Sequence, residues 1–258
     1  MIRYAAKAPA ERRNRELEAT STETWSQCLE VTYETDPELV AAVLPPPLEP
    51  GPRPLVRLNL TQVTMPGNLT FGAGWFGVQA RHGDLVGEYP LFMPMTTEQA
   101  TVGGRETFGE PKQIGEVAIR RGGDAVEGVG SRLGFTLAEV RGTVVGRREP
   151  GERDSVDFYF KLSPSPEEPG QLDSDPLLVH SHKHHTERSV EVVEGDLILK
   201  DSPLDPIADL VVRQVVDIVW SERASVIQAK VVGSVPREDL VPFVHQRYDD
   251  LSVLGTRD

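Results

Sequence analysis

One lysine stands out by its chemistry and by the segment that carries it. Lys112 is one of only six lysines among 27 cationic side chains, so arginine is the usual cation of this chain. A lysine amine that has lost its proton can attack a carbonyl carbon and form a Schiff base, whereas a guanidinium stays protonated and cannot. Desolvation or a neighbouring positive charge favours that loss. Lys112 is therefore a candidate nucleophile, and the alternative is a surface lysine in a turn.

The segment around Lys112 can hold the side chain still and keep water away. Pro111 has a fixed φ angle and biases Glu110 toward an extended conformation. In that conformation Glu110 and Lys112 project to one side, so Glu110 is a candidate acid/base partner or a simple ion-pair partner. Apolar side chains that could line a dry pocket occur nearby, and they are Phe92, Met93, Met95 and Phe108.

Other polar residues near this segment have two interpretations each. Arg105 and Glu106 follow the glycine pair at 103–104, where they either contact a substrate or hold the loop through an ion pair. Gln113, directly after the lysine, is a further candidate for substrate contact. Tyr248 either moves protons at the mouth of the site or is an amphipathic core residue with its hydroxyl at the rim.

Four histidines form a second cluster that attracts notice, at positions 180, 182, 184 and 185. On a strand the first three would share a face, which is a spacing that can bind Zn²⁺. The neighbouring Lys183 and other polar residues favour an exposed strand edge instead, and no metal is expected.

Composition limits the class of protein. The 258 residues carry a net charge of −13 and a pI near 5.0, which argues against nucleic acids and anionic membranes as partners. A single cysteine, Cys28, excludes an intrachain disulfide, and we expect it to be a small core residue. With no apolar run of about 18 residues and no apolar leader, the sequence predicts a soluble, cytoplasmic protein.

Periodicity and turn residues predict many short strands and few helices. Strands are expected over residues 25–33, 54–78, 89–95, 116–120, 125–129, 133–145, 155–162, 179–199 and 210–229. Short helices are expected after Asp36, between Thr96 and a stop at Gly103–Gly104, and from Asp239 to the C-terminus, with an exposed loop over residues 163–176. This pattern predicts an α+β domain, mainly antiparallel, over residues 21–258, preceded by a charged arm over residues 1–20. Periodicity alone leaves open whether the sheet closes.

The residues around Lys112 also resemble a known family. The pattern runs Gly104-Arg105-Glu106, then Gly109, then Pro111-Lys112, and follows Tyr89-Pro90-Leu91 and Met93-Pro94. It resembles the signature of the acetoacetate decarboxylase family, and weaker similarity extends over roughly residues 25–250. The resemblance implies that Lys112 is the Schiff-base lysine, that the fold is a closed cone-like β-barrel with the lysine inside, and that the subunits form homo-oligomers without a cofactor.

The chain departs from this family at several positions. Gln113 stands where decarboxylases of the family carry a second lysine, and Ser26 lies close to the place of an expected arginine. Asn59 and the Ala73-Gly74 region occupy the places of glutamates, and no Asp or Glu occurs from residue 50 to residue 83. The leading hypothesis is a cofactor-free lyase that acts on a small keto acid through Lys112. The alternatives are an aldolase-dehydratase that joins a 2-keto acid such as pyruvate to an aldehyde, and a non-catalytic barrel that binds a small ligand.

Overall fold

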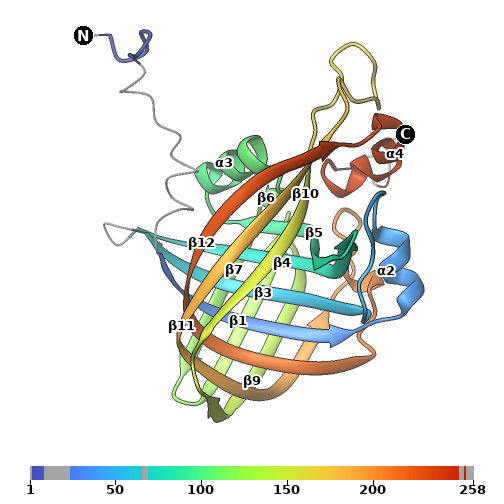
Figure 1. Ribbon diagram of the computed structural model, residues 1–258. Helices are drawn as coiled ribbons and strands as arrows, with labels where there is room; N and C mark the ends of the chain where they lie inside the picture. Colours follow the sequence, from blue (N-terminus) through green and yellow to red (C-terminus); the bar gives the residue numbers. More distant parts are fainter. Residues whose placement is uncertain (1, 9–23, 66–68, 250–252, 254–258) are drawn as a thin grey trace.

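The computed structural model describes residues 2–8, 24–65, 69–249 and 253 of the chain (Figure 1). Its first half contains β1 (Trp25–Glu34), α2 (Pro37–Val43), β2 (Glu49–Pro50), β3 (Leu55–Met65), β4 (Leu69–His82), β5 (Leu85–Met95), α3 (Glu98–Phe108) and β6 (Lys112–Ile114). Its second half contains β7 (Glu116–Gly122), β8 (Ala125–Arg132), β9 (Phe135–Arg148), β10 (Glu152–Lys161), β11 (Leu177–Leu199), η2 (Ile207–Asp209), β12 (Gln214–Ser234), α4 (Arg237–Leu240) and η3 (Val241–Gln246).

Seven strands close into a barrel. They pair in the order β10, β5, β4, β3, β1, β12 and β11, and β11 pairs again with β10 to complete the ring. All of these pairs are antiparallel except β10 with β5, where Asp157 is the register partner of Glu88. The long tilted strands that wrap around the barrel are visible in Figure 1. The expected mainly antiparallel α+β fold with a closed barrel is therefore confirmed.

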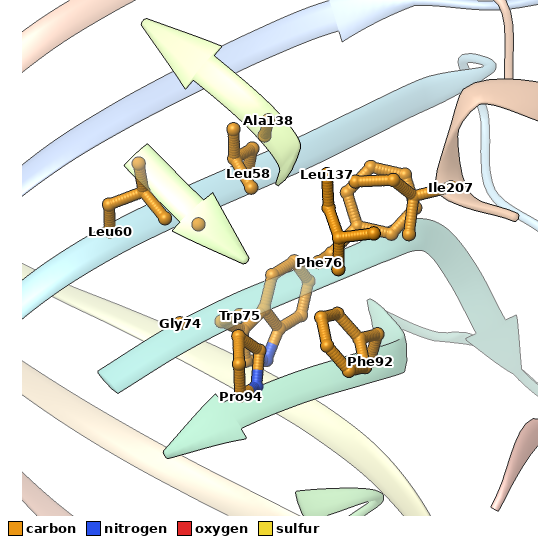
Figure 2. Close-up of a pocket in the computed structure, with 11 residues that line it drawn as sticks. Leu58, Leu60, Gly74, Trp75, Phe76, Phe92, Pro94, Leu137, Ala138 and Ile207 are labelled. Carbon is orange, nitrogen blue, oxygen red and sulfur yellow. The ribbon is translucent and has the colours of Figure 1, made fainter. Parts of the chain in front are cut away.

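A second layer covers part of the outer surface of the barrel. The C-terminal half of β11 pairs with β9, which continues to β8 and β7, and these strands pack against β3, β4 and β5. Strand alternation sends Leu29, Leu58 and Phe76 outward into the main hydrophobic core between the layers. A cavity of about 10 Å³ remains in this core, where side chains such as Leu60, Phe92 and Leu137 converge (Figure 2). A space that small and apolar is a packing defect and not a substrate site.

The opposite strand faces point into the barrel and carry many charged side chains. Arg153 on β10 lies 3.7 Å from Glu30 on β1, although at least two strands separate β10 from β1 in either direction around the ring. Such a contact is possible only across the interior. We call this space the lumen. Because its charges face one another, most of them are paired.

Helix α3 lies at one end of the barrel, near the top of Figure 1, and contacts β5, β6 and β10. The Thr97 hydroxyl accepts from the Ala100 N–H at its start. The expected stop at Gly103–Gly104 is wrong, because the helix runs through both glycines to Phe108 and is capped by Gly109, which has a φ of 83°. A left-handed conformation favours glycine there, and a β-carbon on Gly109 would also lie 2.6 Å from the Lys161 Cα.

The C-terminal segment also differs from expectation. Instead of one helix from Asp239, the chain forms the single turn of α4 and then the 3₁₀ turns of η3. The last part of the expected helix lies outside the described residues, as does most of the expected arm over residues 1–20. Cys28 is 1% exposed, as expected for a core residue. Among the described residues no helix is both long and apolar enough to cross a bilayer.

Candidate active site

Lys112 begins β6 and faces the barrel interior. In the parallel pairing of β6 with β5 its register partner is Met93, so both side chains lie on the same face of the sheet. Met93 belongs to an apolar cluster inside the barrel, and Lys112 itself is only 9% exposed. The candidate nucleophile is therefore enclosed and not a surface lysine in a turn.

Glu110 is the charged neighbour of the Lys112 amine. Its Oε2 lies 2.7 Å from the Lys112 Nζ, and the Glu110 side chain is also buried. The extended Glu110-Pro111-Lys112 segment brings the two groups to one side, as expected. At this distance the carboxylate can accept the proton that the amine must lose before it attacks a carbonyl group.

Two arginines hold the backbone of this segment. Arg105 Nη1 donates to the Lys112 carbonyl oxygen at 2.8 Å. Arg247 Nη1 donates to the carbonyl oxygens of Gly109, at 2.5 Å, and Glu110, at 3.1 Å. The planar guanidinium thus fixes the two residues that precede Pro111. Sequence reasoning missed Arg247 because the residue lies 135 positions from Lys112 and only the tertiary structure brings the two together.

Apolar side chains surround the pair on the barrel side. The buried members of this cluster are Met93, Met95, Phe108, Tyr159 and Val179. Met93, Met95 and Phe108 were expected to line the site. The same expectation for Phe92 is wrong, because strand alternation turns its side chain outward, into the main core between the layers.

A cleft of about 440 Å³ borders the other side of Lys112. Arg105, Gln113 and Tyr248 line it, together with Arg132 and Arg247. The Arg105 guanidinium lies over the Tyr248 ring at 5.2 Å from its centroid, so Tyr248 is oriented by a cation–π contact. Glu106 is exposed on α3 and does not line this cleft.

The far wall of the cleft is fastened by an ion-pair cluster. Arg132 on β8 donates through Nη1 to both carboxylate oxygens of Asp205 at 3.0 Å and through Nη2 to Asp249 Oδ2 at 2.6 Å. This contact ties the C-terminal segment, which carries Arg247 and Tyr248, to the sheet.

The lumen contains carboxylates that sequence reasoning missed. Asp157 on β10 is 1% exposed and accepts hydrogen bonds from Tyr159 and Trp75. Glu88 on β5 pairs with Arg57 at 2.9 Å. Burial raises the pKa of Glu88 to about 7, against the opposing charge of Arg57 and with the help of Asp157. The available signal was one acidic residue inside each of two short, mainly apolar stretches, Val-Asp-Phe-Tyr-Phe and Val-Gly-Glu-Tyr.

The four histidines of β11 do not converge on one point. His180 contacts His82 at 3.0 Å and His184 contacts Asp154 at 2.8 Å, while His185 lies between the hydroxyls of Ser155 and Ser225. The expected exposed edge is wrong, because β11 pairs with β10 on one side and β12 on the other. In the described part of the chain, no three His, Cys, Asp or Glu side chains are arranged to hold a metal ion.

Comparisons with known proteins agree with this architecture. The sequence pattern of the family described as acetoacetate decarboxylase (ADC) matches residues 7–234. The acetoacetate decarboxylase of Chromobacterium violaceum is 28% identical over 200 residues, which cover 72% of this chain and 76% of the relative.

Solved structures share the fold at lower identity. The crystal structure of acetoacetate decarboxylase from Legionella pneumophila superposes with a TM-score of 0.71 at 19% identity, covering 82% of this chain and 87% of that one. The enduracididine biosynthesis enzyme MppR, complexed with the condensation product of pyruvate and imidazole 4-carboxaldehyde, gives a TM-score of 0.69 at 19% identity, covering 82% and 88%. Because the family pattern extends over most of the sequence and the barrel is shared as well, this chain belongs to the acetoacetate decarboxylase family.

Proposed function

We propose that this chain is a lyase in which Lys112 forms a Schiff base with a small keto acid. The observation that carries the proposal is the enclosed Lys112 amine, 2.7 Å from the Glu110 carboxylate. Glu110 takes one proton from the ammonium, and the free amine attacks the substrate carbonyl carbon. Glu110 then returns the proton to the carbinolamine hydroxyl, which leaves as water, and a protonated imine remains on Nζ.

The imine nitrogen then serves as an electron sink. In decarboxylation of a 3-keto acid, the carbon–carbon bond to the carboxylate breaks and CO₂ leaves. The electron pair of that bond forms the enamine double bond, and the imine π electrons move to the nitrogen. The enamine carbon then takes up a proton, and water hydrolyses the imine to release the ketone and the amine. Met93, Met95 and Phe108 limit the access of bulk water. Glu110 is the nearest acid/base group for the proton steps.

Condensation followed by dehydration is the second candidate. In that reaction the imine of a 2-keto acid loses a proton from its methyl carbon, and the enamine adds to an aldehyde before water is lost. The inward positions Asn59 and Ala73 carry no acidic group, which favours this candidate. The complex of MppR with a condensation product of pyruvate supports it as well.

Borohydride trapping tests the proposal. The protein is incubated with pyruvate or acetoacetate, reduced, and analysed by intact mass and peptide mapping. We expect a substrate-dependent adduct on Lys112 that the Lys112→Arg variant lacks, since a guanidinium cannot condense. Release of CO₂ then separates decarboxylation from condensation. If a panel of keto acids leaves no adduct but still binds, the chain is a non-catalytic ligand-binding barrel.

A further inference from the structure

A row of buried side chains connects the Lys112 site with the charged part of the lumen. Tyr159 and Asp157 alternate with outward residues on β10, so both face inward, and each is 1% exposed. The Tyr159 hydroxyl donates to Asp157 Oδ2 at 2.6 Å. Trp75 Nε1 donates to the same oxygen at 3.2 Å, and Lys183 forms an ion pair with it. Three donors from three strands therefore fix the position of this carboxylate.

Tyr159 lies next to the carboxyl group of Glu110, and Asp157 lies next to that of Glu88. The Glu110 carboxylate helps to raise the pKa of the Tyr159 hydroxyl. At the other end, the single register pair between β10 and β5 sets Asp157 beside Glu88. The order from the amine inward is thus Lys112, Glu110, Tyr159, Asp157 and Glu88.

The charges around these groups suit proton transfer. Burial, together with Asp157 and Glu110, raises the pKa of Tyr159 well above its ordinary value, so its hydroxyl passes a proton on without remaining ionised. Glu88 faces Arg57 from β3, Glu30 from β1, Asp157 from β10 and Lys183 from β11. With a pKa of about 7, Glu88 can both hold and release a proton near neutral pH.

We propose that Glu110, Tyr159, Asp157 and Glu88 form a proton path between the Lys112 amine and the charged part of the lumen. The inference rests on the proposed Schiff-base function and assigns roles to three residues that this function had not used. Tyr159, Asp157 and Glu88 are relay residues, since they act on the reaction through Glu110.

The transfer is balanced at every step. Glu110 takes a proton from the Lys112 ammonium and becomes a carboxylic acid. It donates that proton to the Tyr159 oxygen while the Tyr159 hydroxyl proton moves to Asp157, which leaves the tyrosine neutral. Asp157 then passes a proton to Glu88. The reverse sequence returns it to Glu110 when water leaves the carbinolamine, and a further proton, taken up from water at Glu88, reaches the enamine carbon by the same route. The path supplies acidic groups from β5 and β10, whereas the inward faces of β3 and β4 lack them.

The first test removes one oxygen atom from the path. In Tyr159→Phe we expect the rate constant of Schiff-base formation with pyruvate, followed by cyanoborohydride trapping, to fall at least about 10-fold. We also expect its pH profile to lose the inflection near the Glu88 pKa of about 7. The matched control is Tyr33→Phe, because Tyr33 is equally buried but donates to the Leu210 carbonyl oxygen outside the lumen. A Tyr159→Phe rate and pH profile equal to those of the wild type would overturn the path.

The second test needs no catalysis. With ¹³C-labelled glutamate side chains, the wild-type Glu88 carboxyl should titrate with a midpoint of about 7. Asp157→Asn should lower this midpoint, because it removes a neighbouring negative charge. An unchanged midpoint in Asp157→Asn contradicts the path.

If the Asp157→Asn variant does not fold, a third measurement replaces the second test. Tyr159→Phe should then change the Glu110 carboxyl resonance while Tyr33→Phe leaves it unchanged, and an unaffected resonance in Tyr159→Phe overturns the path. If the wild type forms no adduct with keto acids but the Glu88 and Glu110 signals respond to these substitutions as expected, the proposed function fails. The contact between Glu110, Tyr159, Asp157 and Glu88 is then still supported.

Discussion

Gly104 lies so close to Lys112 that a β-carbon at position 104 would be 2.6 Å from both the Cδ and the Nζ of the lysine. The same carbon would be 2.0 Å from Glu110 Oε2. Helix α3 therefore presents bare backbone to the ion pair. This contact explains a glycine in the middle of a helix, where it costs roughly 1 kcal/mol relative to alanine.

Gly104→Ala should displace the Lys112 and Glu110 side chains and reduce keto-acid adduct formation on Lys112 by roughly 100-fold, the effect typical of a misplaced reacting group. Gly103→Ala is the matched control on the same helix, at a residue that is not buried. It should leave the adduct rate unchanged and stabilise the helix slightly. Equal adduct rates in the two variants would contradict the role assigned to Gly104. Trapping followed by mass spectrometry measures both.

Glu110→Gln keeps the size of the side chain but removes the proton acceptor. We expect the rate of Schiff-base formation to fall by roughly 10²- to 10⁴-fold, as for other general bases. Glu106→Gln makes the same exchange on the exposed face of α3 and should leave the rate unchanged. A Glu110→Gln protein that reacts as fast as the wild type would mean that another group accepts the proton.

Arg247→Lys should disturb the site without touching the reacting atoms. The guanidinium reaches the Gly109 and Glu110 carbonyl oxygens with Nη1 and the Arg105 carbonyl oxygen with Nη2, and a lysine ammonium has only one nitrogen, so the segment before Lys112 should loosen. We expect slower adduct formation and a loss of about 1–3 kcal/mol in the free energy of unfolding. Arg237→Lys, at a half-exposed arginine on α4, is the control and should change neither quantity. Stopped-flow kinetics and urea titration provide the two measurements.

Gln113→Lys tests whether a second cation next to Lys112 in the sequence acts on its amine. Along β6, alternation sends the side chain of residue 113 to the face opposite Lys112, toward the cleft. We therefore expect the adduct rate to change by less than about fivefold, the effect of a solvent-screened charge. A larger acceleration, with a pH profile displaced to lower pH, would show that the added charge does reach the amine.

Glu30 should make stability depend on acid pH. Burial works to raise its pKa, but Arg223, Arg57 and Arg153 outweigh burial and lower it from 4.5 to about 2. A depressed carboxyl pKa stabilises the fold above pH 4.5, and this contribution is lost as the pH falls toward 2. At neutral pH it amounts to about 3 kcal/mol.

Glu30→Gln should therefore be less stable than the wild type in urea at pH 7, and the difference should shrink on going to pH 3. The surface pair of Asp36 with Arg213 provides the control. Asp36→Asn should have little effect at either pH, because exposed ion pairs are screened by solvent. A Glu30→Gln deficit that is independent of pH would instead point to lost packing.

The strands and their turns could be predicted from local sequence patterns, whereas the faces of the strands could not. Alternation separates Phe92 from Met93, but it does not say which of the two points inward. The same ambiguity hid Asp157 and Glu88, since each could have been a solvent-facing residue of its strand. The helix stop at 103–104 was wrong for a related reason, because the need for a small residue at Gly104 arises from Lys112, which lies outside the helix.

By itself the sequence determined that Lys112 lies in a segment typical of the acetoacetate decarboxylase family and that Glu110 shares a side with Lys112, since both follow from neighbouring residues. Only the tertiary structure decided that the amine is enclosed, that Arg247 holds its backbone, and that Tyr159, Asp157 and Glu88 extend inward from it. These contacts depend on which distant strands pair. The closure of β10 onto β5 and β11 is set by packing over the whole chain, and no local pattern contains that information.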